Sequence, residues 1–144
     1  MKLTIEHLAP YLPYGIKGYF LGRLDIVTGF DNDFKIISSL NHGNCLITDF
    51  KPILRPLSDL TKEIDHNREK FTVFEKLGDD YVYLACGANL DNHSDIYDYI
   101  FSEHKILELP YLLVQKLISW HFDVFSLLDN GLAINYNDIN TLKP

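Results

Sequence analysis

The spacing of apolar and polar residues changes several times along the chain, and each change marks a predicted element. From Ile16 to Phe30 the chain is rich in aromatic and β-branched residues and is interrupted by glycines, which is typical of a bent strand or a strand pair. Strands are also predicted from Phe34 to Leu40 and starting at Cys45, with polar turns at 31–33 and 41–44 between them. This succession indicates an antiparallel meander.

Short helices are predicted at the two ends of the meander. Thr4 is a good N-cap for a helical turn that reaches Leu8, and the prolines that follow prevent a longer helix because proline has no N–H to donate. Ser58 is the expected cap of a second short helix, which would end near His66.

The central segments between these elements give further predictions. Pro52 and Pro56 are expected to break the chain. Beyond them we predict strands over 71–77 and 81–86, although Phe74, Glu75 and Lys76 fit a helix equally well. A short helix over 95–102 follows, with Ser94 as its cap.

The clearest periodicity lies near the C-terminus. Pro110 suits the first position of a helix and Asn130-Gly131 suits its end, so the pattern predicts one long helix from Pro110 to Leu128. Its polar positions fall in a stripe only about 100° wide, so the helix should be mostly buried, either against the sheet or against a second subunit. The predicted fold class is therefore α+β: a small antiparallel sheet, short helices and this C-terminal helix, in a single domain over residues 1–144.

Composition narrows the classes of function. The chain has 144 residues, of which 47% are hydrophobic, and 13 basic against 20 acidic residues give a net charge of −7. This charge argues against direct nucleic-acid binding, and it leaves open an acidic mimic of nucleic acid. The two cysteines show no disulfide or zinc pattern, and the N-terminus is unlike a signal peptide. The chain also has no apolar stretch of 18 residues. These features predict a cytoplasmic protein without membrane contact.

Histidine and carboxylate positions provide the case for an enzyme. The alternative function is a small hydrolase whose site gathers His93, His104 or His121 with nearby acids. Against it, the helical angle places His121 on the buried side and Asp123 in the polar stripe, and a core imidazole bonded to a backbone carbonyl is the commoner arrangement. The sequence shows no histidine or cysteine spacing typical of a metal site, so no metal and no cofactor are predicted.

Two proline-fixed segments are the candidate binding surfaces. They cover Ala9 to Gly15 and Lys51 to Leu60. Tyrosine and arginine are frequent interface hot spots because they combine contact area with directed hydrogen bonds. The predicted binding residues are Tyr11, Tyr14, Arg55 and Asp59, with a local ion pair between Arg55 and Asp59.

Three blocks of the chain resemble one family. The blocks are LTIEHLAPYLPYG, KPILRPLSDLTKEI, and LPYLLVQKL with WHFDVFSLLDNGLAI. Together they are similar to small uncharacterised proteins encoded in phage and prophage regions of gut-type bacteria. The resemblance implies a phage-associated protein in the bacterial host cytosol and implies no activity. With no catalytic motif in the sequence, we expect a non-enzymatic accessory protein that binds a protein partner. The sequence leaves its oligomeric state open and favours a monomer.

Overall fold

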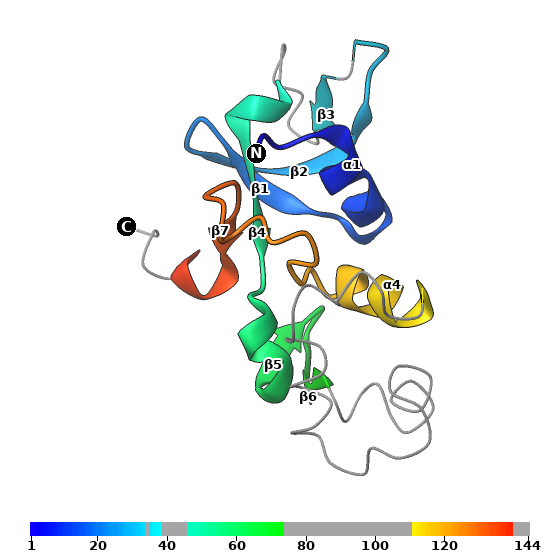
Figure 1. Cartoon of the computed structure of the whole chain (residues 1–144), viewed down its shortest axis with the longest axis vertical. Coiled ribbons are helices and arrows are strands. Elements are labelled where there is room, and N and C mark those ends of the chain that lie inside the picture. Colours follow the sequence, from blue (N-terminus) through cyan, green and yellow to red (C-terminus); the bar gives the residue numbers. More distant parts are fainter. Residues whose placement is uncertain (34, 39–45, 74–110, 140–144) are drawn as a thin grey trace.

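The computed structural model describes residues 1–33, 35–38, 46–73 and 111–139 (Figure 1). The strands are β1 (Lys17–Phe20), β2 (Arg23–Phe30), β3 (Ile36–Ser38), β4 (Phe50–Leu54), β5 (Glu63–His66), β6 (Glu69–Thr72) and β7 (Ile134–Asn135). The helices are α1 (Ile5–Leu8) and α4 (Tyr111–Ser119), and the 3₁₀ turns are η1 (Ala9–Tyr14), η2 (Ile47–Asp49), η3 (Leu57–Thr61) and η5 (Tyr136–Asp138). This mixture of short helices and a mainly antiparallel sheet confirms the α+β class.

One five-stranded sheet has the order β3-β2-β1-β4-β7, and β5 and β6 form a separate hairpin. Neighbours in the large sheet are antiparallel except for β4 and β7, which run parallel. In Figure 1, α1 lies close to β1 and β2, whereas the β5–β6 hairpin lies beyond the end of β4. The predicted meander is thus confirmed for β1, β2 and β3.

The N-terminal turn follows the sequence prediction. Helix α1 begins after Thr4, whose backbone N–H donates to Nδ1 of His7 at 3.1 Å. The prolines then sit in η1, which ends at Gly15 with a φ of 66°. A positive φ is strained for most residues and not for glycine, so Gly15 allows the chain to turn directly into β1.

Two predictions around β4 are wrong. The strand expected from Cys45 begins instead at Phe50, after η2, and Pro52 lies inside the strand that it was expected to break. A proline removes only one backbone donor from a strand. The burial of the apolar neighbours Phe50, Ile53 and Leu54 outweighs that loss.

The segment after Pro56 also differs from its prediction. Its helical part is the 3₁₀ turn η3, which ends at Thr61 rather than near His66, and β5 starts two residues later. The hairpin turn that follows uses Asn67 and Arg68, both at positive φ. The strand predicted over 81–86, the helix after Ser94 and the end of the strand predicted over 71–77 lie outside the described residues.

The long C-terminal helix is shorter than predicted. Helix α4 ends at Ser119, because His121 adopts a left-handed conformation with a φ of 62°. The N–H of Phe122 then donates to the carbonyl of Leu117 and the N–H of His121 donates to that of Ile118, which is the Schellman pattern of a helix end. From there the chain leaves the helical path and pairs with Arg55 through a parallel bridge at Phe122.

The core lies between the sheet and the elements that cover one of its faces. Its completely buried side chains come from the N-terminal corner, the sheet and the chain after α4, and they include Tyr11, Phe50, Leu117, Phe122 and Leu127. We call this covered side of the sheet the inner face. In the part of the chain that the structure describes, no helix is long and apolar enough to span a membrane.

Candidate functional site

The side chain of Tyr11 is buried, although the sequence placed it on a surface. Its hydroxyl donates to the carbonyl of Phe122 at 2.5 Å and accepts a hydrogen bond from the N–H of Val124 at 3.4 Å. Burial raises the pKa of the Tyr11 phenol, so it remains protonated and able to donate. Tyr11 therefore anchors the chain beyond α4 to the N-terminal corner.

Tyr14 makes a second connection to the same part of the chain. Its carbonyl accepts a hydrogen bond from Nε2 of His121 at 2.7 Å, and its hydroxyl accepts one from the side chain of Gln115 at 3.2 Å. The predicted bond between His121 and a backbone carbonyl is confirmed. His121 itself lies just outside α4 and is partly buried.

Arg55 is buried among backbone groups that lie far from it in the sequence. Its Nε donates to the carbonyl of Trp120 at 3.1 Å and its Nη2 donates to that of Asp65 at 2.6 Å. The guanidinium plane also lies 3.9 Å from the centre of the Tyr136 ring, which is a cation–π contact. These contacts replace the predicted ion pair with Asp59, which is absent.

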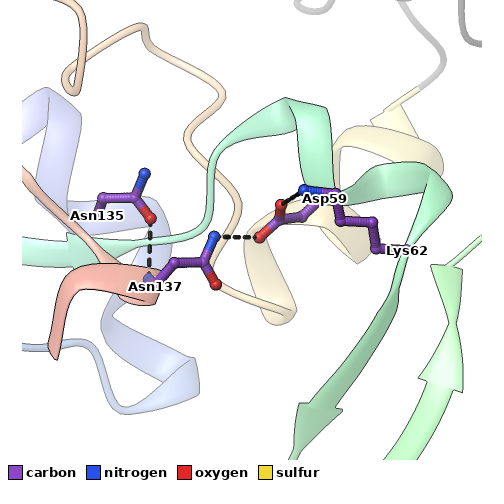
Figure 2. A network of polar contacts seen from close by, with 4 residues as sticks. All are labelled: Asp59, Lys62, Asn135 and Asn137. Carbon is purple, nitrogen blue, oxygen red and sulfur yellow. Dashed lines mark hydrogen bonds and ion pairs between the residues drawn. The ribbon is translucent and has the colours of Figure 1, made fainter. Parts of the chain in front are cut away.

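Asp59 belongs to a different polar network, shown in Figure 2. One carboxylate oxygen accepts a hydrogen bond from the side chain of Asn137 at 2.8 Å, and the other lies 3.4 Å from Nζ of Lys62. The side chain of Asn135 accepts from the N–H of Asn137 and fixes the start of η5. Asp59 therefore holds the last described turn against η3.

The four predicted binding residues share one structural role. Tyr11, Tyr14, Arg55 and Asp59 all contact residues 120–137, which we call the C-terminal segment. Three of them are at most 3% exposed. The sequence thus singled out residues that meet around one segment, and their contacts lie inside the molecule.

The rings of His66 and His121 lie together, with centroids 5.0 Å apart and planes perpendicular. Desolvation lowers the pKa of His66, and the charge of Arg55 lowers it further. Burial likewise lowers the pKa of His121 to about 4. Both rings are neutral at pH 7, and among the described residues no third His, Cys, Asp or Glu joins them as a metal ligand.

The described residues do not bring the predicted hydrolase histidines together with a carboxylate partner. His93 and His104 lie outside the described residues, and His121 donates to a carbonyl rather than to a carboxylate. Asp123, expected in the polar stripe of the helix, is buried, and its two carboxylate oxygens accept hydrogen bonds from the N–H groups of Leu127 and Leu128 at 2.8 and 2.9 Å. Burial raises the pKa of this carboxyl in spite of those bonds.

The opposite side of the sheet, which we call the outer face, was not identified from the sequence. It comprises the outward side chains of β1, β2 and β4, namely Lys17, Tyr19, Leu24, Ile26, Thr28 and Lys51, and it ends at Ile53, which is only 4% exposed. Leu24 is 47% exposed, and Tyr19 and Ile26 are partly exposed. The available signal was β2 itself, where Leu24, Ile26 and Val27 place apolar groups on both faces of one strand.

A groove of about 540 Å³ adjoins this face. It lies where η2, β4 and β7 meet the turn between β1 and β2, and its lining is mainly apolar: Tyr19, Leu21, Gly22, Thr48, Asp49, Lys51 and Ile134. Leu21 is 83% exposed at its rim. Within the described part of the chain, the outer face and the groove together form an apolar surface suited to a partner.

Leu21 is also conformationally unusual. Leu21 and Gly22 form the two-residue turn between β1 and β2, with φ angles of 46° and 88°. Positive φ at both positions is typical of a type I′ turn, whose first position favours Asn, Asp or Gly. A leucine at that position is strained and exposes apolar surface without contributing to the core.

No protein-family model, curated protein sequence or solved structure matches this chain. The assignment of function therefore depends on the site and the sequence alone.

Proposed function

We propose that this chain is a non-enzymatic, phage-associated accessory protein that binds a protein partner in the host cytosol through its outer face and the adjoining groove. The observation that carries this proposal is Leu21, an apolar side chain that is 83% exposed beside the groove and strained in its turn. Stability alone favours asparagine or glycine at this position, so a leucine indicates a role in contact. The phage context comes from the resemblance of the three sequence blocks.

The outer face and the groove do not include the binding residues that were predicted from the sequence. Tyr11, Arg55 and Asp59 are engaged in internal contacts, so they support the fold that presents the outer face. The groove combines apolar walls with a few polar groups, which is the composition expected of a recognition site.

Substitution of Leu21 tests the proposal. Leu21→Asn removes the apolar contact and relieves the turn strain, so it should weaken partner binding while raising the free energy of unfolding by roughly 0.5–1 kcal/mol. Partners are captured on immobilised protein from infected or lysogenic cells and identified by mass spectrometry. Thermal melting of the same samples measures stability.

Leu112→Asn is the matched control, because Leu112 is 53% exposed on α4 and is not part of the outer face. A partner retained by the wild type and by Leu112→Asn, and lost by Leu21→Asn, supports the proposal. Equal capture by all three proteins contradicts it.

A further inference from the structure

The register of the sheet places two lysines diagonally on the outer face. Leu24, Tyr19 and Lys51 form one row across β2, β1 and β4, and Ile26 and Lys17 lie side by side in the next row. Lys17 is two residues before Tyr19, so it is the diagonal neighbour of Lys51. Such neighbours are about 7–8 Å apart in an antiparallel sheet.

The charge of this face is opposite to that of the molecule. The outward positions of β1, β2 and β4 hold two exposed lysines and no carboxylate, although the chain has a net charge of −7. Asp49 is the carboxylate at the margin of the groove, beside Lys51 in the chain. The face is therefore apolar and locally basic, and it complements a partner that is apolar and acidic.

Other classes of partner fit this surface poorly. Nucleic acid and anionic membranes present many phosphates to a bound protein, and two lysines provide few contacts to them. A second copy is also disfavoured, because a symmetric pairing of outer faces brings together surfaces that carry lysines and no acid on their strands. An acidic protein segment is the remaining complement.

The lysine spacing matches that of an extended peptide. Alternate residues of a strand point to the same side and are about 6.5–7 Å apart. Building on the function proposed above, we propose that the outer face binds an extended segment with two carboxylates two residues apart, which pair with Lys17 and Lys51. Apolar side chains at the same two-residue spacing on either side then contact Ile26 and enter the groove beside Leu21.

The two kinds of contact have different roles. Exposed ion pairs contribute little free energy, so the lysines select the partner and orient it. The apolar contacts at the groove supply most of the affinity. Binding should accordingly weaken as salt increases without being abolished.

Selection from a displayed library of random short peptides tests the inference. Peptides enriched on the wild type relative to Leu21→Asn should carry two acids at alternate positions, flanked by apolar residues. Their affinity should fall roughly tenfold on the double variant Lys17→Glu/Lys51→Glu. The double variant Lys2→Glu/Lys116→Glu is the control, since it makes the same change in net charge at exposed positions outside the outer face.

The other outcomes separate this inference from the proposed function. Enriched peptides that are apolar and uncharged or basic overturn the inference and leave the docking role of Leu21 intact. The inference is also overturned if both double variants lower the affinity for the enriched peptides equally. The loss of affinity would then depend on the net charge of the protein rather than on Lys17 and Lys51. No enrichment relative to Leu21→Asn contradicts both proposals.

Discussion

Arg55 is buried and bonds to backbone groups inside the molecule, although arginine is a frequent hot spot of binding surfaces. A guanidinium presents several donors in a fixed planar arrangement, which allows Arg55 to bond the carbonyls of Trp120 and Asp65 at once. Its flat face is then free to lie over Tyr136. One side chain thus connects β4, the hairpin, the end of α4 and η5.

Arg55→Lys should therefore be strongly destabilising although it keeps the charge. An ammonium group cannot reach both carbonyls and stack on the ring, so we expect a loss of roughly 2–4 kcal/mol in the free energy of unfolding. Denaturant titration measures it. Lys62→Ala is the comparison, because the lysine side chain is itself exposed and lies 3.4 Å from the buried carboxylate of Asp59, so its loss should cost only about 1 kcal/mol. Similar losses for both variants would refute the assigned role of Arg55.

The lowered pKa of His121 should make the free energy of unfolding depend on pH. Burial lowers its pKa to about 4 in the folded protein, against an ordinary value of 6.5. The unfolded chain therefore binds more protons between these values, so the stabilising contribution of His121 is complete above pH 6.5 and is lost as the pH falls toward 4. The loss should approach about 3 kcal/mol, and the lowered pKa of His66 acts in the same direction.

His121→Asn provides the test, because asparagine tolerates the left-handed conformation and does not titrate. Between pH 6.5 and 4 the variant should lose clearly less stability than the wild type, as measured by urea denaturation at each pH. The raised pKa of Asp123 opposes the trend in both proteins and cancels in the comparison. Parallel pH profiles would show that His121 is not the group responsible.

Neither the proposed binding surface nor the internal contacts of the predicted binding residues could be found from the sequence. The proline-fixed segments predicted Tyr11, Arg55 and Asp59 as binding residues, and in the structure these side chains make internal contacts. Their partners lie 111, 65 and 78 residues away in the chain, so no local pattern reveals that the side chains point inward. Leu21 was missed for the opposite reason, because its significance depends on a φ angle that only the turn between β1 and β2 reveals.

At the scale of elements, the sequence predicted the turn at Asn130-Gly131 but not the earlier end of α4. Gly131 does close a turn at a φ of 71°, and the N–H of Leu132 donates to the carbonyl of Leu127, as an Asn-Gly stop signal predicts. The helix ends earlier, just before His121, where the sequence has no glycine. The apolar periodicity continues past this residue, so nothing in the sequence signals that the helix ends there. Tertiary bonds to Tyr14 and Arg55 hold the residue where local preference would not.

Trp120 provides a test of how this end of α4 is packed. The ring is only 8% exposed and lies 5.3 Å from the ring of Phe71 in β6. Because one chain is sufficient to cover it, Trp120→Ala should cost about 3–5 kcal/mol through the cavity that it leaves. The melting temperature of the wild type should not vary with protein concentration, and a clear dependence would place Trp120 in a subunit interface instead.

At the scale of the whole molecule, the C-terminal segment connects the N-terminal corner, the large sheet and the turn η3 that precedes the β5–β6 hairpin. The large sheet and the β5–β6 hairpin share no strand pairing. The segment binds the N-terminal corner through Tyr11, the sheet through Arg55, and η3 through Asp59. Its backbone also brackets Arg55, whose N–H donates to the carbonyl of His121 and whose carbonyl accepts from the N–H of Asp123.

Native-state hydrogen exchange should detect this connection as a single cooperative unit. The N–H of Asp123 bonds to the carbonyl of Arg55 at 2.9 Å, and the N–H of Val27 bonds to that of Ile16 at 3.0 Å within the core of the sheet. If the segment and the sheet open only together, both amides should exchange with the same free energy, equal to that of global unfolding. Arg55→Lys should then lower both values by the same amount. Faster exchange at Asp123 than at Val27 in the wild type would show instead that the C-terminal segment detaches by itself. The internal contacts of Tyr11, Arg55 and Asp59 would then stabilise only the attachment of this segment and not the whole fold.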